Sequence, residues 1–141
     1  MAVGTLVDTN VLLDVLTEDE AWLTWSLDAL AAAAEAGPLL INPIIYGEVS
    51  TRFTRIEDLD EALPPQDFRR CALPWEAAFL AGKAFRDYRR RSGAKSTTLP
   101  DFFIGAHAAV DDLTLLTRDA RRIRTYFPTV RLIAPDTDRR S

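Results

Sequence analysis

The chain has 141 residues, a length typical of one globular domain that buries a substantial apolar core. Its residues are 48% hydrophobic and 27% charged, and no apolar run reaches the roughly 18 residues that a transmembrane helix requires. A single cysteine excludes an intramolecular disulfide, and the formal net charge of −4 argues against unselective adhesion to nucleic acid. Because the N-terminus also lacks a signal-peptide pattern, we expect a cytoplasmic protein with no membrane segment.

Strand and helix patterns alternate in the first half of the chain. A short apolar run ends in a carboxylate at Asp8, and a helical pattern follows it. Hydrophobic residues recur at helical spacing over residues 22–36, and Gly37-Pro38 ends this predicted helix. Residues 39–41 have the pattern of a buried strand, and Asn42-Pro43 marks the start of a helix. The residues expected along one face of that helix are Ile45, Val49, Arg52, Phe53 and Ile56.

The alternation continues after a linker at Pro64-Pro65. Proline and glycine again mark the ends of elements, since Pro74 stops a strand, Gly93 lies in a polar loop and Pro100 opens a helix. The elements expected in chain order are a strand over residues 71–73, a helix over 75–91, a loop over 92–98, a helix over 101–112, a strand over 113–117, a helix after Asp119 and a strand over 130–133.

Short apolar strands that alternate with helices favour an α/β fold with a parallel sheet and helices on both of its faces. The sequence contains no internal repeat and no low-complexity linker. We therefore expect one domain over residues 1–135, followed by a polar C-terminal tail over residues 136–141.

Four carboxylates fall at places where an open α/β sheet forms its sites, which lie beyond the carboxyl ends of the strands. Asp8 and Asp119 follow predicted strands. Asp101 starts a helix after a polar loop, and Glu48 lies on or beside the apolar stripe of its helix. Each has a structural alternative, because an aspartate caps helix N-termini and Glu48 can pair with Arg52 one turn away.

Four carboxylates in one crevice repel one another unless a positive charge is present. Mg²⁺ or Mn²⁺ relieves this repulsion, prefers oxygen ligands and leaves room for a phosphate oxygen and an attacking water, which suits phosphodiester hydrolysis. Zinc is not expected, because Cys71 and His107 are far apart and supply no ordinary zinc ligand set. Asp14 is a further acidic residue in a helical segment, for which we expect a capping or solvent-facing role.

Four motifs carry this pattern in a fixed order along the chain. They are Val7-Asp8-Thr9-Asn10, Glu48, Pro100-Asp101-Phe102-Phe103-Ile104-Gly105-Ala106-His107-Ala108 and Leu116-Thr117-Arg118-Asp119. Over roughly Thr5 to Pro135, their order and spacing resemble those of PIN domains. The length and layout resemble, more narrowly, the VapC toxins of bacterial type II toxin–antitoxin systems. The resemblance implies a PIN-like three-layer α/β/α fold with a central, mostly parallel sheet.

The resemblance also implies roles for individual residues. The acidic quartet that binds Mg²⁺ or Mn²⁺ in such nucleases matches Asp8, Glu48, Asp101 and Asp119. Thr9 and Asn10 match polar positions beside the first acid, where Asn10 orients a neighbouring carboxylate, and Thr117 supports the site from its edge. The resemblance further implies RNA cleavage, a homodimer and a cognate antitoxin that blocks the site.

Other residues near these motifs have a functional and a structural interpretation. Arg118, Arg121 and Arg122 are candidates for holding an RNA phosphate, with salt bridges or a helix-face role as the alternative. The expected nucleophile is water rather than a side chain, and we expect packing roles for Gly105 and His107. The aromatic residues that either stack bases and form a partner groove or serve as core and dimer contacts are Trp22, Trp25, Phe53 and Phe85.

Three rival functions follow from the same composition. A haloacid-dehalogenase-like phosphatase requires a second aspartate two residues after the first, where this chain has Asn10. A phosphoacceptor receiver requires a lysine after a late strand, where this chain has Arg118. A non-catalytic PIN-like scaffold that binds RNA or protein would be favoured by a missing acid, and all four acids are present.

Overall fold

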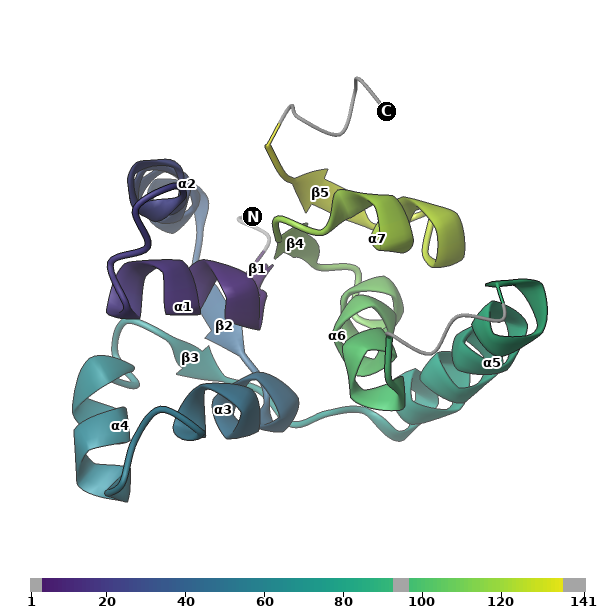
Figure 1. Ribbon diagram of the computed structural model, residues 1–141, viewed down its shortest axis with the longest axis horizontal. Helices are drawn as coiled ribbons and strands as arrows, with labels where there is room; N and C mark the ends of the chain where they lie inside the picture. Colours follow the sequence, from purple (N-terminus) through teal and green to yellow (C-terminus); the bar gives the residue numbers. More distant parts are fainter. Residues whose placement is uncertain (1–3, 93–96, 136–141) are drawn as a thin grey trace.

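The computed structural model describes residues 4–92 and 97–135 of the chain (Figure 1). A five-stranded sheet with the order β3-β2-β1-β4-β5 forms its centre, and each neighbouring pair of strands is parallel. Helices flank this sheet, so the predicted three-layer α/β/α arrangement is confirmed. The predicted loop residues 93–96 and the predicted tail over residues 136–141 lie outside the described residues.

The elements follow the predicted order over most of the described chain. No helix of this part is both long and apolar enough to cross a membrane. The strands are β1 (Thr5–Val7), β2 (Leu39–Ile41), β3 (Arg69–Arg70), β4 (Thr114–Leu116) and β5 (Arg131–Ile133). The helices are α1 (Thr9–Leu16), α2 (Leu23–Ala36), α3 (Pro43–Ser50), α4 (Ile56–Ala62), α5 (Trp75–Ser92), α6 (Leu99–Val110) and α7 (Ala120–Tyr126).

Side-chain caps fix the starts of the helices around the site. The Asp8 carboxylate caps α1, and the Asn42 side chain caps α3 by accepting a hydrogen bond from the backbone N–H of Ile45 at 2.9 Å. A capping box starts α6, in which Thr98 and Asp101 each bond the other's backbone. Three helix starts are therefore set by polar residues that the sequence places directly before or inside the first turn.

The prediction of a strand at residues 71–73 is wrong. β3 begins two residues earlier and covers Arg69–Arg70. Cys71 follows this strand, and its backbone N–H donates a hydrogen bond to the carbonyl of Ile41 at 2.9 Å. Both arginines are exposed, because β3 is an edge strand that pairs on one side alone and needs no apolar run. Cys71 is half-buried, and burial raises the pKa of its thiol.

The single helix predicted to carry Ile45 through Ile56 on one face is also wrong. α3 ends at Ser50, and α4 begins only at Ile56, which is 61% exposed. The hydroxyls of Ser50 and Thr51 donate to backbone carbonyls three residues earlier, at 2.6 and 2.8 Å. Such local bonds compete with helix continuation and account for the break.

The two central strands, β1 and β4, form the middle of the core. Leu6, Val7, Leu115 and Leu116 are fully buried. The chain runs from β1 outward to β2 and β3, then returns to the other side of β1 to form β4 and β5. The connections therefore diverge between β1 and β4, and a doubly wound sheet binds its ligands at this switch point.

Candidate active site

A pocket lies at this switch point. Its wall comes from the β1–α1 junction, from α3, from the start of α6 and from the β4–α7 junction. The residues that line it are Asp8, Thr9, Asn10, Leu13, Glu48, Asp101, Asp119 and Arg122. The structure thus brings together all four predicted acids, two of the three predicted supporting residues and one of the three predicted arginines.

Asp8 lines the pocket and is only 7% exposed. Its Oδ1 accepts a hydrogen bond from the backbone N–H of Thr9 at 2.7 Å, and its Oδ2 accepts one from the Thr117 hydroxyl at 2.7 Å. Burial raises the pKa of Asp8 to about 6, although these two hydrogen bonds and the nearby Arg122 guanidinium act in the opposite direction. The carboxylate is therefore held in one orientation at a place where its charge is costly.

Thr9 connects the first two acids. Its backbone N–H binds Asp8, and its hydroxyl donates to Oε1 of Glu48. The sequence alternative of a pair between Glu48 and Arg52 is thus replaced by a contact between α3 and α1. One threonine thereby fixes the relative positions of two carboxylates that are 40 residues apart in the sequence.

Asp101 and Asp119 are each engaged by a residue of their own segment. Oδ2 of Asp101 accepts hydrogen bonds from the backbone N–H and the hydroxyl of Thr98, at 2.8 and 3.1 Å. Oδ2 of Asp119 forms an ion pair with Nη1 of Arg122, one turn along α7. The capping alternative is therefore realised for Asp101 as well as for Asp8, and both residues still line the pocket.

The donor set fits a hard divalent cation in its chemistry. The pocket offers only oxygen ligands and one counter-charge, Arg122. Within residues 4–92 and 97–135, no three carboxylate, imidazole or thiol groups already stand together as a metal site. In this arrangement Thr98 and Arg122 each contact one oxygen of Asp101 and of Asp119, respectively.

Thr117 and Asn10 both contact the Asp8 carboxylate. Thr117 is fully buried, and its Oγ1 accepts a hydrogen bond from the backbone N–H of Asp119 at 2.9 Å while it donates to Asp8. Nδ2 of Asn10 lies 3.5 Å from Oδ2 of Asp8, and its Oδ1 accepts from the backbone N–H of Arg118 at 3.2 Å. These contacts place a hydroxyl and an amide group beside the same carboxylate.

The three candidate arginines have different surroundings. Arg118 forms a two-pronged ion pair with Asp14 and does not line the carboxylate pocket. Arg122 pairs with Asp119, and its buried Nε has no hydrogen-bond partner among the described residues. Arg121 lines an adjoining pocket. The salt-bridge alternative is therefore realised for Arg118 and Arg122.

The prediction of a capping or solvent-facing role for Asp14 is wrong. Asp14 is 3% exposed and accepts hydrogen bonds from Arg118 and from the hydroxyl of Ser26. A signal was present in the sequence, because Asp14 stands one turn after the apolar Val11 on the same helix face. An acid on a buried face requires a cationic or hydrogen-bonding partner.

His107 and Gly105 have the packing roles that the sequence predicts. His107 is fully buried between Asn42 and Asp111, each 3.0 Å from one ring nitrogen, and burial lowers the pKa of the imidazole. A Cβ at Gly105 would lie 2.5 Å from the Phe127 ring. Neither residue lines the carboxylate pocket.

The four aromatic candidates also have packing contacts. Trp25, Phe53 and Phe85 are partly buried against the hydrophobic core. Trp22 packs edge-on against Trp25, with ring centroids 6.2 Å apart, and the Arg118 guanidinium lies over its ring. The core interpretation therefore accounts for Trp25, Phe53 and Phe85.

The family model for the PIN domain matches residues 5–128. The chain belongs to the PIN domain family. All four acids of this PIN domain lie inside the matched range, and the match is to neither the phosphatase nor the receiver class that the sequence left as rivals. No curated protein sequence matches the chain significantly.

Solved structures of toxin–antitoxin complexes have the same fold as this PIN domain. A chain from VapBC2 of Rickettsia felis bound to a promoter DNA fragment is 16% identical, with a TM-score of 0.67, and the match covers 93% of this chain and 98% of that one. A chain from VapBC-1 of nontypeable Haemophilus influenzae is 14% identical, with a TM-score of 0.68 and coverages of 93% and 97%. A chain from a toxin–antitoxin complex of Klebsiella pneumoniae is 24% identical, with a TM-score of 0.63, and the match covers 89% of this chain and 94% of that one.

Proposed function

We propose that this PIN domain is a metal-dependent endoribonuclease toxin that hydrolyses phosphodiester bonds in RNA and is inhibited by a cognate antitoxin. One observation supports this most strongly. Four carboxylates from four separate segments line one pocket at the switch point of the sheet. Convergence of this kind costs electrostatic repulsion, which a catalytic cation would relieve.

The residues that would hold Mg²⁺ or Mn²⁺ are Asp8, Glu48, Asp101 and Asp119. A divalent cation in such a pocket supplies positive charge to the phosphate oxygens in the transition state and lowers the pKa of a water nucleophile. The chain's own residues prepare the ligands. Thr9 and Thr117 orient two of the carboxylates, and Arg122 provides a positive charge beside them.

The proposed path of an RNA strand runs from the carboxylate pocket into the pocket beside it. The two pockets share Asp119 and Arg122, and the second also contains Arg121, Tyr88 and Tyr126. Arginine binds phosphate through two parallel hydrogen bonds, and tyrosine rings stack on unpaired bases. We therefore propose Arg121 and Arg122 as phosphate contacts on one side of the scissile bond.

The proposed partners are an antitoxin and a second copy of the chain. The similarity to the toxin–antitoxin complexes supports an antitoxin, and we propose that a basic side chain of that partner enters the carboxylate pocket in place of a cation. A complex whose contacts all avoid this pocket would contradict that placement. Trp75 and Phe79 on α5 are 89% and 70% exposed, which supports a homodimer, whereas a monomer mass in light scattering would contradict it.

A non-catalytic PIN scaffold is the second candidate function. It is favoured by the engagement of Asp101 with Thr98 and of Asp119 with Arg122, because these contacts satisfy two of the four acids without a cation. The two candidates differ in one measurable property. A nuclease requires the pocket to bind Mg²⁺ or Mn²⁺, and a scaffold does not.

The test is cleavage of a mixed single-stranded RNA by the purified protein in Mg²⁺ or Mn²⁺. We expect cleavage by the wild type, and loss of cleavage in EDTA and in Asp8→Asn. The matched control is Asp112→Asn, which removes an exposed carboxylate that pairs with Arg131 and does not line the pocket, and this variant should cut at the wild-type rate. An inactive wild type that also shows no Mn²⁺ binding in calorimetry would favour the scaffold.

A further inference from the structure

Asp14 on α1 is a further buried acid, and it does not line the carboxylate pocket. Its Oδ2 accepts hydrogen bonds from Nε of Arg118 and from the Ser26 hydroxyl, both at 2.7 Å, and its Oδ1 accepts one from Nη2 of Arg118 at 2.9 Å. Asp14 is 3% exposed, whereas Arg118 is 27% exposed. The pair is thus a partly buried, two-pronged ion pair between α1 and the segment that follows β4.

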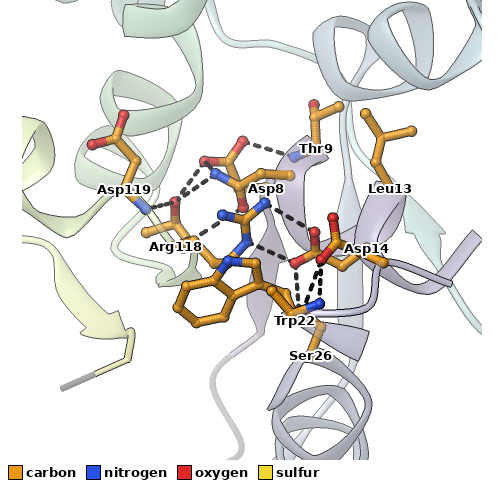
Figure 2. Close-up of polar contacts among 12 residues, drawn as sticks. Asp8, Thr9, Leu13, Asp14, Trp22, Ser26, Arg118 and Asp119 are labelled. Atoms are coloured by element: carbon orange, nitrogen blue, oxygen red, sulfur yellow. Dashed lines mark hydrogen bonds and ion pairs between the residues drawn. The ribbon is translucent and has the colours of Figure 1, made fainter. Parts of the chain in front are cut away.

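The Arg118 guanidinium is also held by an aromatic ring. Its Cζ lies 4.8 Å from the centroid of the Trp22 ring, a distance at which a cation is attracted to the ring face. Figure 2 shows the Arg118 side chain directed toward Asp14 and Trp22, with the Asp119 carboxylate on the side away from Asp14. The guanidinium is thus held by Asp14 and Trp22, and Arg118 does not line the pocket that would hold the scissile phosphate.

The position of Arg118 in the chain connects this ion pair to the site. Arg118 stands between Thr117, whose hydroxyl donates to Asp8, and Asp119, which lines the pocket. Its own backbone N–H donates to Asn10 at 3.2 Å. Only residues 117–119 separate β4 from α7, so a shift of Arg118 moves both neighbours.

We propose that Asp14, Arg118 and Trp22 form a clamp that positions the Thr117 hydroxyl and Asp119 around Asp8. The clamp ties residues 117–119 to the C-terminal half of α1, while Asp8 caps the N-terminus of the same helix. This inference rests on the proposed nuclease function and assigns Arg118 a positioning role instead of a phosphate contact.

The energetics of buried ion pairs favour a geometric role. The desolvation cost of such a pair offsets much of its Coulombic gain, so apolar residues of similar size would stabilise the fold as well. A two-pronged arginine–carboxylate contact additionally fixes distance and orientation. Residues that orient metal ligands from behind typically change metal affinity or activity by about 10- to 100-fold when they are replaced.

The main test compares Arg118→Met, Arg118→Lys, Asp14→Asn and the double variant Asp14→Asn/Arg118→Met. We expect Arg118→Met to weaken Mn²⁺ binding in calorimetry and to lower kcat by about 10-fold or more, with the KM for RNA within about twofold of wild type. Arg118→Lys keeps the charge but loses the fork, so it should not rescue kcat. The double variant should be no worse than the single variants, because both break one contact.

The salt dependence of RNA binding separates a positioning role from a phosphate contact. Measured in EDTA, the slope of log Kd against log salt should be unchanged in Arg118→Met, whereas loss of a phosphate contact lowers it by about one. Arg122→Met is the comparison, because Arg122 lines the proposed RNA path and its slope should fall. Arg131→Met removes an exposed ion pair elsewhere and controls for loss of charge.

Several outcomes would overturn the clamp. A lowered salt slope with unchanged Mn²⁺ affinity in Arg118→Met would make Arg118 a phosphate contact. A second contrary outcome is that Arg118→Met lowers only the Tm. If its Mn²⁺ affinity and kcat, both measured well below that Tm, equal those of the wild type, the ion pair has a purely structural role.

Hydrogen exchange of the backbone amides of Arg118 and Asp119 tests whether the clamp holds this segment, and the measurement does not depend on RNA cleavage. Faster exchange in Arg118→Met supports it, and unchanged exchange contradicts it. A wild-type protein that neither binds Mn²⁺ nor cuts RNA would overturn the proposed function, and this exchange would still decide whether the clamp holds residues 117–119.

Discussion

The Asp8 carboxylate shows how burial couples the site to stability. Its pKa rises from 3.8 to about 6, first because burial disfavours the charged form. Between these two values the folded state keeps a proton that the unfolded state has already lost. The contribution of Asp8 to stability is therefore fully present below pH 3.8 and is lost as the pH rises through about 6.

We accordingly expect Asp8→Asn to stabilise the metal-free protein at neutral and basic pH. The asparagine removes a buried charge whose cost is about 1–3 kcal/mol, from 1.36 kcal/mol for each unit of pKa shift. Urea unfolding in EDTA should show a larger gain at pH 8 than at pH 5. Equal gains at both pH values, or a loss at pH 8, would contradict this account of Asp8. Asp112→Asn serves as the control, since its carboxylate is exposed.

The place of a site residue could be predicted from the sequence where the residue follows a recognisable strand or helix pattern. Asp8 and Asp119 stand at the ends of apolar strands, and these ends meet at one edge of a parallel sheet. The partner of Asp14 could not be found in this way, because Arg118 is 104 residues away and no periodicity relates the two. Tertiary ion pairs of this kind depend on the packing of α1 against the β4–α7 junction.

At the scale of elements, α6 and α7 pack closely at Gly105. A Cβ there would lie 2.5 and 2.7 Å from two atoms of the Phe127 ring and 3.0 Å from Cδ1 of Ile123. Phe127 and Ile123 are both buried, so neither side chain has free space to move into. Gly82 on α5 is the opposite case, because nothing lies within 4 Å of a Cβ at that position.

These two glycines give a matched pair of substitutions. Gly105→Ala should lower the free energy of unfolding by about 1–3 kcal/mol, since overpacking outweighs the gain in helix propensity. Gly82→Ala should raise it by up to about 1 kcal/mol through propensity alone. Thermal unfolding followed by circular dichroism measures both. A stabilised Gly105→Ala would mean that Phe127 repacks without cost.

Element types were easier to predict than element ends. The long α5 and the apolar β1, β2 and β4 have clear patterns, and each lies within a residue or two of its predicted range. The predicted position of β3 is two residues too late, because an exposed edge strand of two arginines has no hydrophobic pattern. The break between α3 and α4 was missed because hydroxyl-to-carbonyl bonds, which end α3, leave the hydrophobic spacing unchanged.

At the scale of the whole molecule, the pocket is assembled from parts that only the complete sheet brings together. Asp8 and Glu48 come from the first half of the chain, and Asp101 and Asp119 come from the second. A ligand that binds all four therefore binds the folded state and not the unfolded one. Such a ligand stabilises the entire fold by mass action.

We expect Mn²⁺ to raise the Tm of the wild-type protein. At a concentration 100 times its Kd, the ion adds about 2.7 kcal/mol to the free energy of unfolding, or roughly 10 °C in Tm for a chain of this size. Calorimetric scans with MnCl₂ should show this shift, and choline chloride at equal ionic strength should not. Asp8→Asn should abolish the shift. If the Tm of the wild-type protein does not change with Mn²⁺, the result argues against the metal site.

Two threonine hydroxyls orient carboxylates of the pocket and still leave lone pairs for a metal ion. Each hydroxyl has one hydrogen, and both hydrogens are directed at carboxylates, from Thr9 to Glu48 and from Thr117 to Asp8. Each carboxylate oxygen has a second lone pair, which the hydroxyl leaves free for a cation. The hydrogen bonds that orient these two acids would therefore stay intact when a metal ion binds.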